Sequence, residues 1–280
     1  MECVVLNNGV KMPKVGFGTY QITDPKDCER SVIDAVAAGY RLIDTAQAYG
    51  NEEAVGAGIK NCSVPREELF ITTKVWFRSY ETESCRASVE ESMRKLNLEY
   101  VDMILLHWPF GNTYAAWRVL EGLYEAGTVR AIGVSNYMGS QLIDLIHFNK
   151  ITPAVNQIET NLLCQQWGLS ELMKKYNVLH QAYAPFGQGR ANDMFESPVV
   201  REIASAHGKT ARQTALRFML QRGIAVIPKS THRERMAENL DVGGFTLSDE
   251  EMRRLKALDT GTPLIGSSQS PELAEFAMTW

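Results

Sequence analysis

The chain has 280 residues, of which 45% are hydrophobic and 22% are charged, and these fractions exclude intrinsic disorder and a collagen-like repeat. The formal net charge is −4, which argues against a protein that grips nucleic acid backbones. The length allows two average domains or one (β/α)8 barrel of about 250 residues, so the order of elements has to decide between them.

The first residues of the chain and its cysteines indicate the cellular compartment of the protein. Residues 1–18 lack the charged and then apolar pattern of a secretory signal, and no apolar run approaches the roughly 18 residues of a membrane-spanning helix. Five scattered cysteines without a C-x-x-C pair indicate reduced thiols rather than a disulfide framework or a metal site; they are Cys3, Cys28, Cys62, Cys85 and Cys164. We therefore expect a cytoplasmic protein with no membrane or nucleic acid partner.

In chain order, the first expected element is a hairpin in residues 4–13 that turns at Asn8 and Gly9. Eight apolar runs follow, and they are nearly continuous, as in strands buried on both faces of a parallel sheet. The runs cover residues 14–20, 40–46, 69–76, 100–108, 130–136, 153–159, 178–187 and 224–230.

Amphipathic stretches between these runs predict helices. In the first of them, Val32, Ile33 and Val36 share one face and Gly39 is a natural stop. Strands that alternate with helices about eight times predict a parallel α/β architecture. We expect a single (β/α)8 TIM barrel domain spanning residues 1–280, with the hairpin at its base, and a doubly wound open sheet is the alternative.

Several common motifs are absent. The dinucleotide fingerprint G-x-G-x-x-G fails because Gln21 stands where the third glycine after Gly16 and Gly18 belongs. The histidines have no metal-ligand spacing, so we expect no metal site. Four of them have no matching role and are expected on the surface or at helix caps: His147, His180, His207 and His232.

Polar side chains end seven consecutive predicted strands. The active site of a (β/α)8 barrel lies at these carboxyl ends, so the pattern predicts a catalytic site there. The residues are Asp44 with Tyr49 after it, Lys74, His107, Ser135 with Asn136, Gln157, Tyr183, and Lys229 with Ser230.

The first four of these residues form a chemical unit. A phenol has a pKa of about 10, too high for efficient proton delivery near neutrality, and a nearby ammonium such as Lys74 lowers it. Asp44 keeps that lysine charged and oriented, and His107 orients a carbonyl oxygen or shares the proton. The sequence therefore predicts that Tyr49 is a general acid aimed at a substrate oxygen.

This arrangement resembles the aldo-keto reductase family along nearly the whole chain. The matching segments, in family order, are GFGTY, YRLIDTAQAYGNEEAVG, LFITTKVW, YVDMILLHWP, VRAIGVSN, VNQIE, AYAPFGQG and IPKSTHRERMAENLD. The resemblance implies a (β/α)8 barrel that binds NADP(H) across its carboxyl face. It also implies an oxidoreductase that transfers hydride from NADPH to the carbonyl carbon of aldehydes, ketones or dicarbonyls.

The resemblance implies a role for each matching residue. Tyr49 is the proton donor, Lys74 lowers its pKa, Asp44 pairs with Lys74, and His107 orients the carbonyl. At the nicotinamide, Ser135, Asn136 and Gln157 hold the carboxamide and Tyr183 stacks on the ring. The other residues that the resemblance implies for cofactor binding are Gly18, Thr19, Tyr20, Asp44, Pro185 and Gly187. The adenosine end comprises Lys229, Ser230 and Thr231, with Arg235 on the 2′-phosphate and Glu238 and Asn239 near adenine.

The substrate side is expected to be an apolar mouth. It comprises Tyr20, Tyr49, Trp76, His107, Trp108 and Phe110, although the three residues Trp76, Trp108 and Phe110 have barrel-to-helix packing as an alternative. The sequence departs from the family pattern at residues 160–162, where Thr-Asn-Leu follows VNQIE in place of a region containing His-Pro. The short connection 110–114 favours an open site that accepts many aldehydes.

Two other functions stay open. A Schiff-base lyase would use Lys74 as its nucleophile, and Asp44 argues against it by stabilising the charged amine. A non-catalytic NADPH-binding regulatory module is disfavoured by the intact set of four catalytic residues. We expect the chain to act as a monomer on a small-molecule carbonyl substrate.

Overall fold

Eight parallel strands form the centre of the computed structural model, which describes residues 2–189 and 193–279. They are β3 (Phe17–Gly18), β4 (Leu42–Asp44), β5 (Phe70–Val75), β6 (Val101–Leu106), β7 (Val129–Ser135), β8 (Val155–Glu159), β9 (Leu179–Tyr183) and β10 (Ala225–Val226). Each strand pairs with the next along the chain, and a parallel bridge between Val15 and Val226 joins the two ends of the sheet. The predicted (β/α)8 barrel is confirmed, and the open sheet is wrong.

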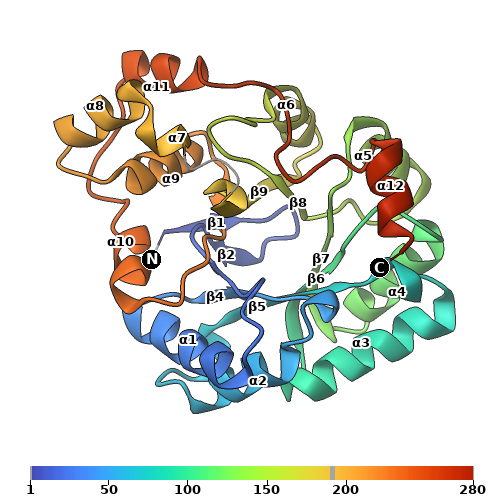
Figure 1. Cartoon of the computed structure of the whole chain (residues 1–280). Coiled ribbons are helices and arrows are strands. Elements are labelled where there is room, and N and C mark those ends of the chain that lie inside the picture. Colours follow the sequence, from blue (N-terminus) through green and yellow to red (C-terminus); the bar gives the residue numbers. More distant parts are fainter. Residues whose placement is uncertain (1, 190–192, 280) are drawn as a thin grey trace.

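Helices surround the strands, and Figure 1 views them roughly along the barrel axis. They are α1 (Pro25–Ala38), α2 (Glu52–Asn61), α3 (Thr82–Leu96), α4 (Thr113–Glu125), α5 (Gly139–Phe148), α6 (Trp167–Lys175), α7 (Asp193–Glu196), α8 (Pro198–Ala206), α9 (Ala211–Gln221), α10 (Arg233–Leu240), α11 (Asp249–Lys256) and α12 (Pro271–Ala277). Short 3-10 turns are η1 (Gln47–Tyr49), η2 (Arg66–Glu68), η3 (Phe77–Ser79) and η4 (Gly187–Gly189). No helix among the described residues is long and apolar enough to cross a membrane.

The caps of α1 show how local sequence sets an element. The Asp24 side chain accepts a hydrogen bond from the Asp27 backbone at the helix start, and Gly39 ends the helix with a φ of 115°. Val32 and Val36 are buried as expected, whereas Ile33 is half-buried at the edge of the apolar face. The alternation of such helices with buried strands builds the outer core of the barrel.

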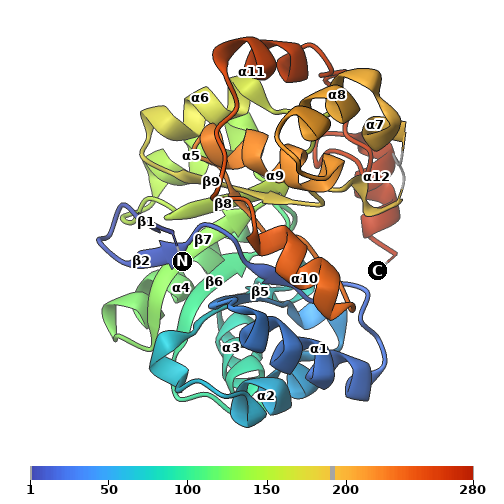
Figure 2. The same cartoon turned by 90° about the vertical axis from the view of Figure 1, so that its left-hand side faces the viewer.

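The predicted hairpin is present at the base of the barrel. Strands β1 (Cys3–Val5) and β2 (Lys11–Pro13) pair antiparallel. In the turn between them, Asn7 donates to the Pro153 carbonyl at 3.0 Å and Asn8 donates to the Arg130 carbonyl at 2.9 Å. Figure 2 shows the hairpin and α12 at opposite ends of the barrel. The hairpin therefore does not cover the end on which α12 lies.

One expected surface residue is buried. His180 lies within β9 and is 5% exposed, which corrects the prediction of a surface or capping position. Its ring nitrogens lie 2.7 Å from the Thr160 hydroxyl and 2.7 Å from the Ser170 hydroxyl. The histidine therefore ties the departing loop at residues 160–162 to the barrel wall.

Candidate active site

A cavity of about 1110 Å3 opens at the carboxyl ends of the strands. It exceeds the 300–1,000 Å3 that is usual for a site of one small molecule. The predicted residues that line it are Gly18, Tyr20, Asp44, Tyr49, Trp76, His107, Trp108, Ser135, Asn136, Gln157, Tyr183, Pro185 and Lys229. Residues predicted at or after all eight strands of the barrel thus meet in one place.

Other predicted residues do not line this cavity. They are Thr19, Lys74, Phe110, Gly187, Ser230, Thr231, Arg235, Glu238 and Asn239. Thr19 is fully buried and donates to the Asp44 carbonyl at 3.1 Å. Phe110 lies one layer back, stacked on Trp108 with ring centroids 5.8 Å apart, as the packing alternative expects.

Lys74 lies directly behind Tyr49. Its ammonium donates to the Asp44 carboxylate at 2.5 Å, to the Thr45 carbonyl at 2.9 Å and to the Tyr49 hydroxyl at 3.3 Å. The lysine side chain has no exposed surface. Because the Tyr49 oxygen accepts a hydrogen bond from Lys74, its own proton remains available to a group in the cavity.

Burial has the largest effect on the pKa values of Tyr49 and Lys74. It raises the pKa of Tyr49 well above 10, and the Asp44 charge acts in the same direction. Burial also lowers the pKa of Lys74, and the charge of Asp44 opposes that shift. The net direction is upward, so Tyr49 is a protonated phenol at neutral pH, and the lowering of its pKa by Lys74 stays a prediction.

His107 lies beside Tyr49, with ring centroids 5.7 Å apart at 76°. Burial, reinforced by the charge of Lys74, lowers the pKa of His107 well below 6.5. The imidazole is therefore neutral at neutral pH and donates through one nitrogen only. Its Nδ1 is buried without a hydrogen-bond partner among the described residues.

A network of amide and hydroxyl groups forms the wall next to these residues. The Tyr183 hydroxyl donates to the Asn136 side chain at 2.8 Å, and Asn136 donates to the His107 carbonyl at 3.0 Å. Gln157 donates to Asp44 at 2.7 Å, and Ser135 donates to the Gln157 carbonyl at 2.8 Å. Asn136 has a φ of 64°, a left-handed conformation that asparagine tolerates better than most residues.

Only some of the residues predicted to bind the adenosine end of the cofactor line the cavity. Lys229 lines the cavity, whereas Arg235 lies on the exposed side of α10. Glu238 accepts a hydrogen bond from the Thr210 hydroxyl at 2.6 Å, and Asn239 is 3% exposed. The last two residues therefore hold α10 against its neighbours in this structure.

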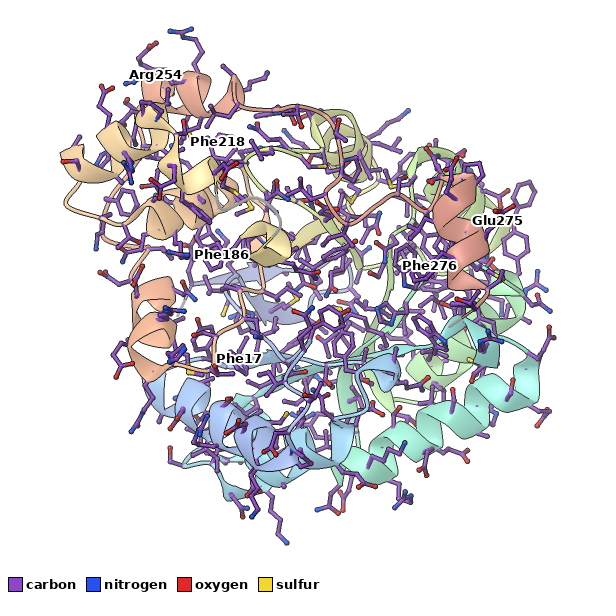
Figure 3. The ribbon with its side chains drawn as sticks, in the orientation of Figure 1. Phe17, Phe186, Phe218, Arg254, Glu275 and Phe276 are labelled. Atoms are coloured by element: carbon purple, nitrogen blue, oxygen red, sulfur yellow. The ribbon has the colours of Figure 1, made fainter. Side chains whose placement is uncertain are left out.

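Sequence reasoning missed part of the wall. The missed residues are Gln21, Ala48, Gln188, Gly189, Phe195, Arg212, Ile227, Ile265, Leu273 and Phe276. Gln188 and Gly189 directly follow the run at residues 178–187, so the position of that run was a usable signal. In contrast, Leu273 and Phe276 lie on α12, far in sequence from any strand end. Figure 3 shows Phe276 on the side of α12 toward the barrel mouth and Glu275 on the opposite side.

The described residues include no group of three or more His, Cys, Asp or Glu side chains placed to hold a metal ion. The donors in the cavity are instead phenol, imidazole, amide and hydroxyl groups, with Lys229 and Arg212 as cations on its wall. Such a set suits an organic ligand that carries both aromatic and phosphate groups.

Comparisons with known proteins give concordant matches. The model of the Aldo/keto reductase family matches residues 14–260. The 9,11-endoperoxide prostaglandin H2 reductase of Trypanosoma cruzi is 43% identical and covers 92% of each chain. The glyoxal reductase of Bacillus subtilis is 41% identical over 92% of this chain and 93% of its own. A Bombyx mori aldo-keto reductase solved in complex with NADP is 32% identical, with a TM-score of 0.90 and 95% of each chain covered.

Proposed function

The chain belongs to the aldo/keto reductase family, and from this premise we propose that it reduces aldehydes, ketones or dicarbonyls with NADPH, using Tyr49 as the proton donor. The Bacillus subtilis relative is named a glyoxal reductase, which supports small carbonyl compounds as the substrate class.

One observation carries the proposal. Tyr49 lines the cavity and its hydroxyl accepts a hydrogen bond from Lys74 at 3.3 Å, so the hydroxyl proton is available to a ligand and is not donated to the lysine. The arrangement suits a general acid next to a reacting oxygen.

The chain's residues would act on the carbonyl oxygen. Neutral His107 donates a hydrogen bond to this oxygen and fixes its position, which stabilises the negative charge that develops there. Tyr49 then gives its proton to the oxygen, and the resulting phenolate is stabilised by the Lys74 ammonium. The nicotinamide, when bound, supplies the hydride to the carbonyl carbon.

The cavity fits such a cofactor. Its volume exceeds that of an ordinary small-molecule site, Tyr183 presents an aromatic ring, and Asn136 and Gln157 present amides. These amides would hold the nicotinamide carboxamide while Tyr183 stacks on the ring. The neighbour from Bombyx mori, which is solved with NADP, supports the same choice.

Replacement of Tyr49 by Phe tests the proposal. We expect the rate of NADPH consumption with a panel of aldehydes, ketones and dicarbonyls to fall on the order of 10²- to 10⁴-fold, because general acid catalysis contributes about that much. NADPH binding should remain. Tyr176→Phe is the control, because Tyr176 contacts exposed His147 away from the cavity. Full activity of Tyr49→Phe on a substrate that the parent protein reduces would refute the assignment.

The structure gives no support to the Schiff-base alternative. A lysine nucleophile has to contact the substrate, and the side chain of Lys74 has no exposed surface behind Tyr49.

A further inference from the structure

We propose that Arg212 binds the pyrophosphate of the dinucleotide, an inference that rests on the proposed function. Arg212 belongs to the first turn of α9 and its side chain lines the cavity. Within residues 2–189 and 193–279, Lys229 is the other lysine or arginine on the cavity wall. A dinucleotide brings an anionic pyrophosphate to this wall, and a buried phosphate without a cation is unfavourable.

The guanidinium of Arg212 is held by two aromatic rings. Its central carbon lies 4.9 Å from the Phe195 ring centroid and 6.0 Å from the Phe186 ring centroid. These rings pack edge to face, with centroids 5.9 Å apart, and both line the cavity. Figure 3 shows Phe186 beside η4 at the barrel mouth. Stacking of this kind orients a planar cation before a ligand arrives, so less freedom is lost on binding.

The hydrogen-bond donors of Arg212 are available to a ligand. No carboxylate of the described residues forms an ion pair with it, and its guanidinium lies against the two rings. Two other arginines, within α9 and at its C-terminal end, have hydrogen-bond acceptors. Arg217 donates to the Thr246 hydroxyl at 3.3 Å, and Arg222 donates to the Gln165 carbonyl at 2.8 Å. Arginine presents a fork of N–H groups that matches two phosphate oxygens.

The position of Arg212 selects the pyrophosphate among the phosphates of NADPH. The chain after β9 runs from Tyr183, expected at the nicotinamide, through Pro185 to Phe186, over which Arg212 lies. The group that follows the nicotinamide ribose in a dinucleotide is the pyrophosphate. The 2′-phosphate is assigned separately to Arg235 on α10, an element that follows β10.

The test compares the dissociation constants of NADPH and NADH, because both contain the pyrophosphate and only NADPH has the 2′-phosphate. Binding is measured by quenching of tryptophan fluorescence, without substrate. For Arg212→Ala and Arg212→Met we expect both constants to rise by the same factor, about tenfold or more, since charged hydrogen bonds of this strength are lost. For Arg235→Ala only the NADPH constant should rise. Arg118→Ala is the matched control: this exposed arginine stacks on Tyr114 at 6.0 Å, away from the cavity.

Three outcomes would overturn the inference. Unchanged binding of both cofactors to Arg212→Met would show that Arg212 acts only through packing, because methionine keeps contact with the rings but has no charge. A loss confined to NADPH would place Arg212 on the 2′-phosphate. If the parent protein binds neither cofactor, the proposed function fails together with the inference, whereas the first two outcomes leave the proposed function intact.

Discussion

At the scale of single residues, the site depends on the different effects of burial on an acid and on a base. Burial raises the pKa of Tyr49 and lowers that of Lys74, so each group is shifted toward its neutral form. Asp44 opposes the shift of the lysine through a hydrogen bond of 2.5 Å. The first of the two catalytic groups to lose its proton as the pH rises is therefore Lys74, and Tyr49 keeps its proton.

This order of titration predicts the pH profile of carbonyl reduction. The rate should fall on the alkaline side below the ordinary lysine value of 10.5, because a neutral Lys74 no longer stabilises the phenolate. Asp44→Asn removes the charge that raises the pKa of Lys74, so the alkaline fall should move to lower pH. The measurement is kcat against pH for both proteins. An alkaline limb that stays in place in Asp44→Asn would contradict the role of Asp44.

Single residues also show what the sequence can and cannot predict about the site. Asp44, Tyr49 and His107 were found because strand ends of a parallel barrel meet at one face. The direction of the pKa shift of Tyr49 could not be predicted from the sequence, because it depends on how completely the barrel buries the phenol. The sequence shows which residues are charged, whereas the burial of a side chain is a property of the folded chain.

At the scale of elements, the C-terminal segment completes the cavity. The buried Glu159, at the end of β8, accepts hydrogen bonds from the backbone of Leu264 at 2.7 Å and of Ile265 at 2.9 Å. Ser268 donates to the Asn136 carbonyl at 2.6 Å. Ile265 lines the cavity. Sequence patterns did not predict this segment, because it has no apolar periodicity and is placed by contacts far apart along the chain.

We predict that Glu159 positions this segment for substrate binding. Glu159→Gln replaces one acceptor oxygen with a donor that faces a backbone N–H, so at least one charged hydrogen bond is lost. The KM for a carbonyl substrate should rise several-fold while the dissociation constant of NADPH stays the same. The amides of Leu264 and Ile265 should exchange faster with deuterium. Glu275→Gln is the control, because Glu275 points away from the mouth (Figure 3).

An unchanged KM, or equal losses in substrate and cofactor binding, would contradict this role for Glu159. The first result would mean that the segment holds its place through Ser268 and α12. The second would mean that the variant damages the barrel itself.

At the scale of the whole molecule, closure of the barrel depends on very short strands. β3 and β10 have two residues each, and they meet through the bridge between Val15 and Val226. Gly16 adds a hydrogen bond to the Val226 carbonyl at 2.8 Å, and a Cβ at Gly16 would lie 2.2 Å from a Leu42 methyl group. The apolar runs predicted both strands, but their lengths depend on the twist of the closed sheet, which no local pattern contains.

The net charge of the molecule conceals the character of its cavity. The chain is acidic overall, with 33 Asp and Glu against 29 Lys and Arg, yet the cations on the cavity wall are Lys229 and Arg212 within the described part of the chain. Carboxylates elsewhere therefore set the charge of the surface, and the site keeps a local preference for anions.

A buried base makes the stability of the whole barrel depend on pH. Burial lowers the pKa of His180 from 6.5 to about 3. The unfolded chain binds a proton at this histidine below pH 6.5 and the folded chain does not, so stability is present above that pH and is lost as the pH falls toward 3. Between pH 8 and pH 5 this residue should lower the free energy of unfolding by about 2 kcal/mol.

Urea unfolding of the parent protein and of His180→Gln at both pH values tests this contribution. The glutamine can still bond the Thr160 and Ser170 hydroxyls but does not titrate, so the loss of stability between the two pH values should be smaller by about 2 kcal/mol. His147→Gln removes an exposed histidine and should keep the loss seen in the parent. An equal loss in His180→Gln and in the parent would mean that His180 titrates alike in the folded and unfolded chains, and the acid sensitivity would then come from groups outside this part of the core.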